Sequence, residues 1–197
     1  MEKEKSERAA RFEIKDGTLV KHRGCDGAVV IPDGVTAIGD GAFCYFKSLV
    51  EVAIPSSVAS IGDRAFEGCS SLVGMTIPDS VASIGERAFM HCHGLKSVNI
   101  PSAVKTIAYR AFEGCSALTE IVVPRGVTRI EVGAFGNCSA LASVTIPKSV
   151  EYIGENAFGG CDALSDVYYG GSKRAWQKLS NGIFGNTEIE YRVHFNN

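Results

Sequence analysis

A 23-residue internal repeat dominates this chain. Its prolines fall at positions 32, 55, 78, 101, 124 and 147, so every interval between them is 23 residues. Phenylalanine keeps the same interval at 43, 66, 89, 112, 135 and 158. Two residue types that share one period along most of a chain indicate stacked structural repeats, because each unit buries its apolar face only against its neighbours.

Aligned on the proline, the unit reads I-P-x-x-V-x-x-I-G-x-x-A-F-x-x-C-x-x-L-x-x-V-x. Residues 72–77 are expected to alternate between inward and outward positions, which is the pattern of a half-buried strand. Proline has no N–H, so each proline marks the end of a strand. The spacing Val81…Ile84 predicts a second, shorter extended side. The six copies begin at Ile31, Ile54, Ile77, Ile100, Val123 and Ile146.

A bend and an inward turn complete the unit. Glycine recurs after the second extended side, and we expect it to adopt positive φ at Gly39, Gly62, Gly85 and Gly154. Asp63 or Glu86 then opens a short helical turn that directs the Ala-Phe pair into the core. The pattern therefore predicts a leucine-rich-repeat solenoid: a parallel β-sheet with short helical turns, built from six 23-residue repeats with N- and C-terminal caps.

The chain divides into three predicted parts. Residues 1–30 form an N-terminal tail and a β-hairpin cap around Asp16-Gly17, residues 31–168 form the repeats, and residues 169–197 form a C-terminal cap. In that last cap, Ser172 is placed to N-cap a short helix through Trp176 and Leu179. Residues 188–195 are expected to form a terminal strand.

Composition excludes several partners. The net charge is −2 with both signs mixed, so the chain lacks the basic footprint of a nucleic-acid-binding protein. No run of apolar residues is long enough for a membrane helix, which predicts no membrane insertion. The charged residues 1–8 lack the apolar region of a secretory signal peptide.

Cysteine follows the repeat as well. Side chains in one column of a parallel sheet lie about 4.8 Å apart, whereas disulfide-bonded Cβ atoms need about 3.5–4.5 Å. We therefore expect buried, reduced thiols, since free cysteine is an ordinary core residue. Cys25 and Cys44 lie outside the column, and a disulfide between them is open. The column comprises Cys69, Cys92, Cys115, Cys138 and Cys161.

Two polar clusters have alternative interpretations. His91-Cys92-His93 resembles a metal cluster, but Cys92 belongs to the inward column and zinc ligands are normally spaced more widely, so repeat variation is favoured. Arg64, Arg87 and Arg110 share one column, either as an anion- or partner-binding stripe or as a solvated ridge balanced by nearby carboxylates. The ridge is favoured, because paired surface charges usually contribute little.

The unit L-x-x-V-x-I-P-x-x-V-x-x-I-G-x-x-A-F-x-x-C resembles the BspA-like leucine-rich repeat, also called the Treponema pallidum type. The resemblance covers all six repeats, and residues 168–176 are similar to the closing segment of such proteins in gut bacteria. It implies a parallel-sheet solenoid and a surface or secreted protein that takes part in adhesion and protein binding. The chain departs from the pattern at Phe46, which replaces cysteine, and at Ala108 and Glu131, which replace the bend glycine.

The exposed face of the strands is the expected binding surface of a solenoid. Its candidate partner-binding residues are Glu51, Ala53, Thr76, Ser97, Asn99, Glu120, Val122, Ser143, Thr145, Asp166 and Tyr168. We find no Gly-x-Ser-x-Gly elbow, phosphate loop or His-Glu-x-x-His motif, and we predict no catalytic, cofactor-binding or metal-binding residue and no cofactor.

The resemblance predicts a non-catalytic protein-interaction module of the adhesion type, on a bacterial surface or secreted, whose partner is a protein or a surface glycan. The alternative is an intracellular structural or scaffolding solenoid in the cytoplasm. Reduced cysteines and the absence of a signal peptide from residues 1–8 favour that alternative.

Overall fold

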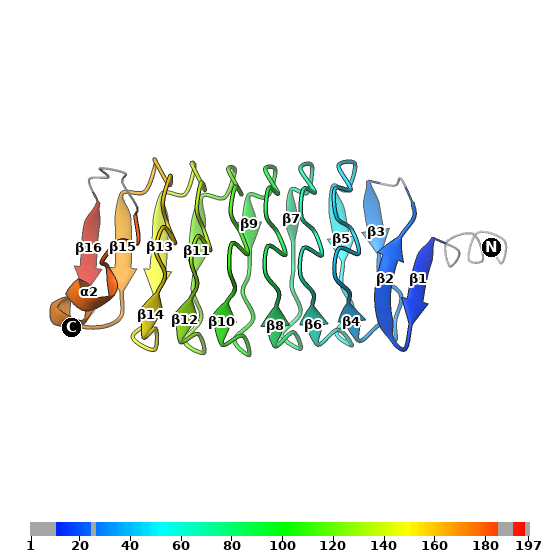
Figure 1. Ribbon diagram of the computed structural model, residues 1–197, viewed down its shortest axis with the longest axis horizontal. Coiled ribbons are helices and arrows are strands. Elements are labelled where there is room, and N and C mark those ends of the chain that lie inside the picture. The colour runs from blue at the N-terminus through cyan, green and yellow to red at the C-terminus, as the bar shows by residue number, and fades with distance from the viewer. Residues whose placement is uncertain (1–10, 25–26, 185–190, 196–197) are drawn as a thin grey trace.

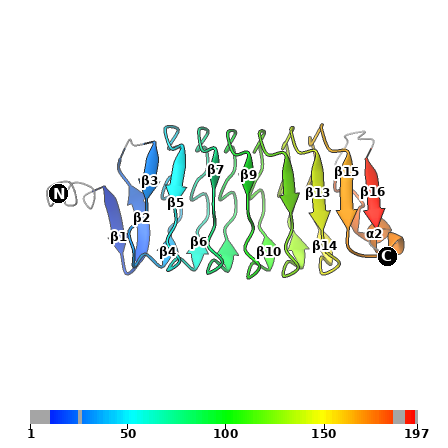
Figure 2. The same cartoon turned by 180° about the vertical axis from the view of Figure 1, so that it is seen from behind.

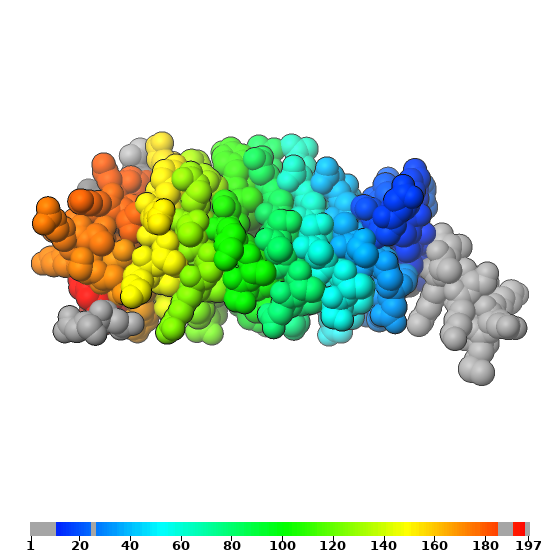
Figure 3. All heavy atoms as spheres, turned by 90° about the horizontal axis from the view of Figure 1, so that it is seen from below, coloured from blue at the N-terminus to red at the C-terminus, as the bar shows by residue number. Residues whose placement is uncertain are grey.

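The computed structural model describes residues 11–24, 27–184 and 191–195. They form an elongated parallel β-solenoid of about seven turns, with β1 (Phe12–Lys15) and β16 (Arg192–Phe195) at opposite ends of the rod (Figures 1 and 2). The predicted leucine-rich-repeat solenoid is confirmed, and the space-filling view shows the coils following one another in chain order along it (Figure 3).

The longer side of each coil contributes a strand to the first sheet. These strands are parallel and in register, with Val29 opposite Val52 and Val144 opposite Val167. In β5 and β11 the middle residue is buried and its neighbours are exposed, as the alternation predicts. The strands are β3 (Ala28–Val30), β5 (Glu51–Ala53), β7 (Gly74–Met75), β9 (Ser97–Val98), β11 (Glu120–Val122), β13 (Ser143–Ile146), β15 (Asp166–Tyr169) and β16 (Arg192–Phe195).

The shorter side of each coil builds a second sheet. At its N-terminal end β1 pairs antiparallel with β2 through a turn in which Asp16 and Gly17 have φ of 48° and 75°, so the predicted hairpin is present. The strands are β1 (Phe12–Lys15), β2 (Thr18–His22), β4 (Ala37–Ile38), β6 (Ser60–Ile61), β8 (Ser83–Ile84), β10 (Thr106–Ile107), β12 (Arg129–Ile130) and β14 (Tyr152–Ile153).

The third side is a turn arc, residues 62–72 and their equivalents at 23-residue intervals. Here the predicted short helical turns are wrong: the arc is a series of β-turns, with bonds such as Glu67 N–H to Arg64 C=O at 3.0 Å and Leu72 N–H to Cys69 C=O at 3.1 Å. Left-handed φ values of 54° at Arg64 and 72° at Gly68 interrupt the uniform negative φ that a helix needs. Of the described residues, only α2 (Lys173–Leu179) is α-helical.

The bend glycines have a role different from the one expected. Positive φ does not occur at Gly39, Gly62, Gly85 or Gly154. Instead, a Cβ placed on Gly85 would lie 2.6 Å from the backbone nitrogen of Asp63 in the preceding coil. These glycines are therefore needed because two backbones approach closely, which is the other property that a missing side chain provides.

Phenylalanine rings form a continuous stack through the core. Consecutive rings from Phe43 to Phe158 have centroids 5.0–5.5 Å apart and planes within 3–7° of parallel. These separations lie in the range of favourable offset stacking. Each of these rings is 2% exposed or less, so the stack links every repeat to the next.

The thiols form a ladder beside the phenylalanines. Each column cysteine donates to the carbonyl of a phenylalanine 26 residues earlier, as Cys92 Sγ does to Phe66 at 3.1 Å. The column is fully buried and free of disulfides, as predicted, and burial raises the pKa of Cys115 to about 12. Cys44 is also free and half-buried, whereas Cys25 lies outside the described residues.

The C-terminal end has its own small core. Ala175 N–H donates to Ser172 Oγ at 3.3 Å, which confirms the predicted N-cap of α2. Trp176 is 5% exposed and packs on Tyr169 with ring centroids 5.3 Å apart. Strand β16 begins at Arg192, one residue after Tyr191, and residues 188–190 of the predicted 188–195 strand lie outside the described residues. The division of the chain at residues 30 and 168 stays a prediction.

Both sheets are interrupted at one coil boundary, which we call the seam, between residues 77–99 and 100–122. The first sheet consists of β3-β5-β7-β9 and β11-β13-β15-β16, and the second of β1-β2-β4-β6-β8 and β10-β12-β14. The turn arc continues across the seam through bonds such as Phe89 N–H to Ala111 C=O at 2.8 Å and His91 N–H to Glu113 C=O at 2.7 Å. The coils therefore stay stacked while both ladders stop.

Two substitutions coincide with the seam. In earlier coils an aspartate links neighbouring bends: Asp63 Oδ1 accepts from Glu86 N–H at 2.8 Å. At the seam this column carries the longer Glu86, and the bend glycine becomes Ala108. Glu131 also replaces a bend glycine, yet its N–H still donates to Ile107 C=O at 2.9 Å. We infer that the combination of Glu86 and Ala108 separates the strands.

The double variant Glu86→Asp/Ala108→Gly is expected to restore pairing between β8 and β10. Amide hydrogen exchange of residues 105–107 should slow, and the free energy of unfolding should rise by about 1 kcal/mol, the net value of a typical hydrogen bond. Glu131→Gly is the matched control, which changes the same column away from the seam. Equal exchange rates in the wild type and the double variant would contradict this cause of the seam.

Candidate functional site

The exposed side of the first sheet carries all of the predicted partner-binding residues. They lie on or directly after β5, β7, β9, β11, β13 and β15, and each is partly or fully exposed. Strand register aligns them in two rows: Glu120, Ser143 and Asp166 are consecutive partners in one, and Val122, Thr145 and Tyr168 in the other. The rows are therefore in register on each side of the seam, and many of their side chains are small.

Charge on this face is acidic. Glu51 and Glu120 are exposed, and no ion pair forms with either among the described residues. Apolar contact area is available beside them, because Val122 is 62% exposed and Tyr168 is 42% exposed. Such a mixture suits a partner surface that presents basic and apolar side chains together.

Asp166 is the centre of a polar cluster on the last coils. His194 Nε2 lies 2.7 Å from its carboxylate, Ser165 Oγ donates to it at 2.8 Å, and Arg192 lies 3.4 Å away. The His194 and Ser165 hydrogen bonds, with the Arg192 charge, hold the pKa of Asp166 below its usual value. The serine bonds the carboxylate and not the imidazole, so this is not the nucleophile–base arrangement of a hydrolase. The cluster links β16 to β15 through a hydrogen bond and ion pairs.

Acid is expected to weaken the contacts of Asp166 with His194 and Arg192. Because the folded pKa of Asp166 lies below the unfolded value of about 3.9, its stabilising contribution is complete above the unfolded pKa and is lost as the pH falls through the folded one. In wild-type protein the ring-proton shifts of Tyr168, which stacks on His194, should therefore change below pH of about 4. Asp166→Asn should remove that transition, whereas Asp162→Asn, a change at an exposed carboxylate nearby, should preserve it. An unchanged transition in Asp166→Asn would contradict the assignment.

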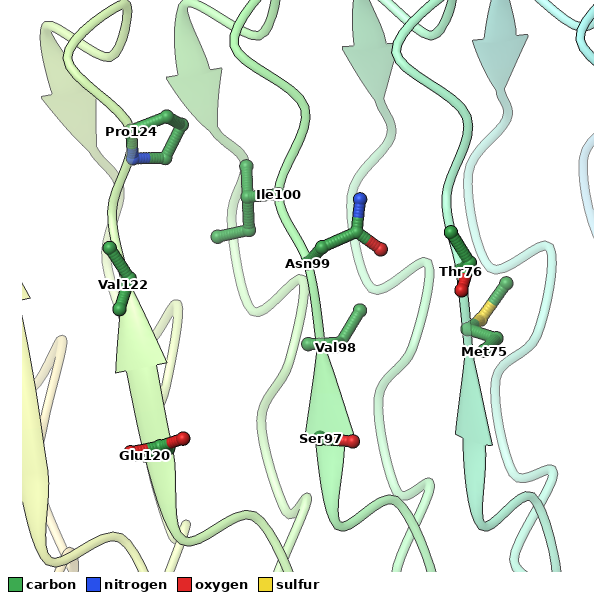
Figure 4. A pocket seen from close by; sticks show the side chains of 9 residues that line it. All are labelled: Met75, Thr76, Ser97, Val98, Asn99, Ile100, Glu120, Val122 and Pro124. Atoms are coloured by element: carbon green, nitrogen blue, oxygen red, sulfur yellow. The ribbon is translucent and has the colours of Figure 1, made fainter.

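A groove of about 590 Å³ opens on the face at the seam. It crosses β7, β9 and β11, and Figure 4 shows Asn99 turned toward Thr76, away from Val122 and Pro124. We call it the seam groove. Its lining residues are Met75, Thr76, Ser97, Val98, Asn99, Ile100, Glu120, Val122 and Pro124.

Asn99 has a role that its position on the face does not reveal. Its Oδ1 accepts from Ile77 N–H at 2.8 Å and its Nδ2 donates to Ile77 C=O at 2.7 Å. In regular coils the equivalent N–H bonds a backbone carbonyl, as Val123 N–H does to Thr145 C=O at 2.9 Å. The side chain thus substitutes for a strand partner. The sequence placed Asn99 on the face but did not reveal this bridge. The feature that could have revealed it is an amide side chain in a column whose other members are mostly small or β-branched.

The arginine column lies on the turn arc, away from the face. Arg64 Nε is 3.6 Å from Glu67 and Arg110 Nε is 3.1 Å from Glu113. Arg87 and Arg110 both lie over the Tyr109 ring, 5.4 Å and 5.0 Å from its centroid. The predicted balance by carboxylates therefore holds for Arg64 and Arg110. It does not hold for Arg87, which has Met90 at the position of Glu67 and Glu113 and lies over the Tyr109 ring instead.

The histidine pair also lies on the arc. The rings of His91 and His93 are 5.5 Å apart, while Cys92 points inward to the carbonyl of Phe66. Across residues 11–24, 27–184 and 191–195, no three His, Cys, Asp or Glu side chains gather closely enough to hold a metal ion. In the same residues, no helix has the length and apolar character needed to span a bilayer.

Comparison with known proteins identifies the family to which this repeat is similar. Residues 27–139 and 84–196 match the model of the BspA type leucine rich repeat region. A leucine-rich repeat protein of T. pallidum is 30% identical, with a TM-score of 0.77 over 94% of this chain and 98% of that one. Among curated protein sequences no match is found.

Two longer structures are also similar. A leucine-rich cell surface protein of Faecalibacterium prausnitzii is 27% identical, with a TM-score of 0.54 over 82% of this chain and 63% of that one. A leucine-rich repeat protein of Bacteroides ovatus is 25% identical, with a TM-score of 0.61 over 91% of this chain and 58% of that one. This chain therefore spans about three fifths of these two proteins.

Proposed function

Because the chain belongs to the BspA-type leucine-rich repeat family, we propose that it is a non-catalytic protein-interaction module, displayed on a bacterial surface or secreted. Proteins of this type are interaction modules. The finer statement concerns adhesion, in which the exposed side of the first sheet binds a protein outside the cell.

One observation carries the proposal: on each side of the seam, the exposed rows of the first sheet lie in register over a buried core. The side chains directly beneath the rows, such as Val144 and Val167, are 1% and 0% exposed. A partner that binds the face therefore meets a surface whose backbone is already ordered, which lowers the entropic cost of association. Val122 and Tyr168 supply exposed apolar area, and Glu51 and Glu120 supply charge.

Location outside the cell is supported by a relative. The protein of Faecalibacterium prausnitzii that is 27% identical to this chain is described as a cell surface protein. Treatment of intact source cells with protease, followed by fractionation, tests the location. Digestion of the chain on intact cells, or its recovery from the medium, is expected. Protection inside the cell would overturn the location and favour the intracellular scaffold.

Binding is tested with a matched pair of double variants. Ser143→Arg/Thr145→Arg places two large cations on the face, and Ser139→Arg/Asp162→Arg places them on the turn arc. Each full chain is titrated against immobilised extracellular-matrix proteins, both native and enzymatically deglycosylated. We expect saturable binding that the face variant weakens at least about tenfold, a loss of about 1.4 kcal/mol, and that the arc variant preserves.

Other outcomes are equally informative. Equal losses in both variants would contradict binding by the face, and no saturable binding by the wild type would contradict the adhesion proposal. Binding that disappears on deglycosylation would identify a surface glycan as the partner in place of protein.

A further inference from the structure

We propose that the seam groove receives the primary carboxamide of an asparagine or glutamine side chain, presented by an extended segment of a protein partner beside a lysine or arginine. This inference rests on the proposed function and names the chemistry of the partner segment. The groove is thus the place on the face where binding becomes selective for side-chain type.

An unused backbone donor lies in the groove. In regular coils the residue before the proline donates to the next coil, as Ile31 N–H does to Ala53 C=O at 3.0 Å. Within the described part of the chain, Ile100 N–H has no such acceptor, because β9 and β11 are not paired. Ile54 N–H is likewise without an acceptor there, but Ile54 does not line the groove. An unpaired donor in a confined site favours a ligand that supplies an acceptor.

The neighbouring coil shows which ligand fits. Asn99 fills the same position one coil earlier, where its carboxamide bonds both the N–H and the C=O of Ile77. At the seam the equivalent side chain is Val122, which has no polar atom to offer Ile100. A carboxamide from outside would therefore make at Ile100 the two bonds that Asn99 makes at Ile77. Carboxylates supply acceptors only, so Asp and Glu lack the donor for the C=O.

The walls of the groove add selectivity. Met75 and Val98 are partly exposed, whereas Val52 and Ile121 in the same column are 6% and 2% exposed. With Val122 and Pro124 they offer apolar contact to the stem of the inserted side chain. Glu120 lines the same groove and is exposed, so a lysine or arginine next to the amide gains a charge partner.

The test uses full-length, ¹⁵N-labelled protein and three short peptides. The first is acetyl-Gly-Lys-Asn-Lys-Gly-N-methylamide, and the others carry aspartate or leucine in place of the asparagine. We expect the asparagine peptide to shift the Ile100 amide resonance and to bind about tenfold more tightly than either other peptide, since each net hydrogen bond contributes a factor of a few. Glu120→Gln should weaken the asparagine peptide and flatten its salt dependence.

Two asparagine variants make the test specific. Val122→Asn places a carboxamide one coil after Asn99, so it should bond Ile100 itself, slow exchange of the Ile100 amide and reduce peptide affinity about tenfold. Ser139→Asn adds the same group on the exposed turn arc, outside the binding face, so peptide binding should be unchanged. The protected Ile100 amide also shows that Val122→Asn is folded.

Equal affinities for the asparagine and leucine peptides, or unchanged binding in Val122→Asn, would overturn the inference. If the peptide series fails while Ser143→Arg/Thr145→Arg still weakens binding to matrix protein, the groove assignment is wrong and the binding face stands. If binding to matrix protein is absent as well, the proposed function fails together with it.

Discussion

Replacement of Phe112 by alanine should lower the free energy of unfolding by about 3–5 kcal/mol. Phe112 is fully buried, and its ring stacks on Phe89 at 5.2 Å and on Phe135 at 5.4 Å. Removal of the ring leaves a cavity and breaks two stacked pairs at once. Because each coil is stabilised chiefly by its neighbours, the loss falls on both sides of the fourth repeat.

Urea-induced unfolding, followed by far-ultraviolet circular dichroism, measures this loss. Phe112→Leu serves as a graded control, because it retains most of the apolar volume and should cost less than about 1.5 kcal/mol. A midpoint for Phe112→Ala equal to that of the wild type would mean that the ring stack does not stabilise the solenoid.

The second large effect is expected at Gly85. A Cβ on Gly85 would lie 2.6 Å from the backbone nitrogen of Asp63, so Gly85→Ala forces two coils apart. The cost should be about 1–3 kcal/mol, as for other overpacked sites. The displacement should also break the bond from Gly85 N–H to Ile61 C=O, now 2.9 Å, and open a second seam between β6 and β8.

Gly74→Ala is the matched control for Gly85→Ala. A Cβ on Gly74 would approach no atom more closely than 3.9 Å, and its φ is not positive. Its stability should equal that of the wild type or exceed it slightly, because alanine restricts the unfolded chain. The comparison uses thermal unfolding and amide exchange of residues 82–84. Equal stabilities of the two variants would contradict the close-approach role of the bend glycines.

The repeat period predicted most of the fold, because a column that recurs in every coil must face the same neighbours each time. Phe66 and Cys92 were placed in the core on this ground, and both are fully buried. The hairpin around Asp16-Gly17 and the cap at Ser172 followed from local chemistry, which depends little on the rest of the chain.

Backbone conformation in the turn arc was harder to predict. Left-handed φ falls at Arg64 and Asn156 as well as at Gly41, so no single residue type marks the column. The recurrent glycine at Gly85 indicated a special backbone position. A single sequence does not distinguish a close backbone contact from a positive φ, because both require glycine. The seam escaped prediction because it arises from Ala108 and Glu86 together, which lie in neighbouring coils.

The candidate binding face was likewise predictable only in part. Its residues were identifiable from the outward positions of the strands, since alternation fixes which side chains leave the core. The groove and the unpaired Ile100 N–H depend on the spacing between two coils, which one repeat unit does not encode.

Site-specific photo-crosslinking on native cells tests most directly the claim that the face binds the partner. A benzophenone amino acid is placed at Thr145 on the first sheet, at Arg129 on the second sheet, or at Ser139 on the turn arc. We expect a discrete crosslinked protein from position 145 and none from the other two positions. A crosslink from position 129 or 139, with none from 145, would contradict the claim.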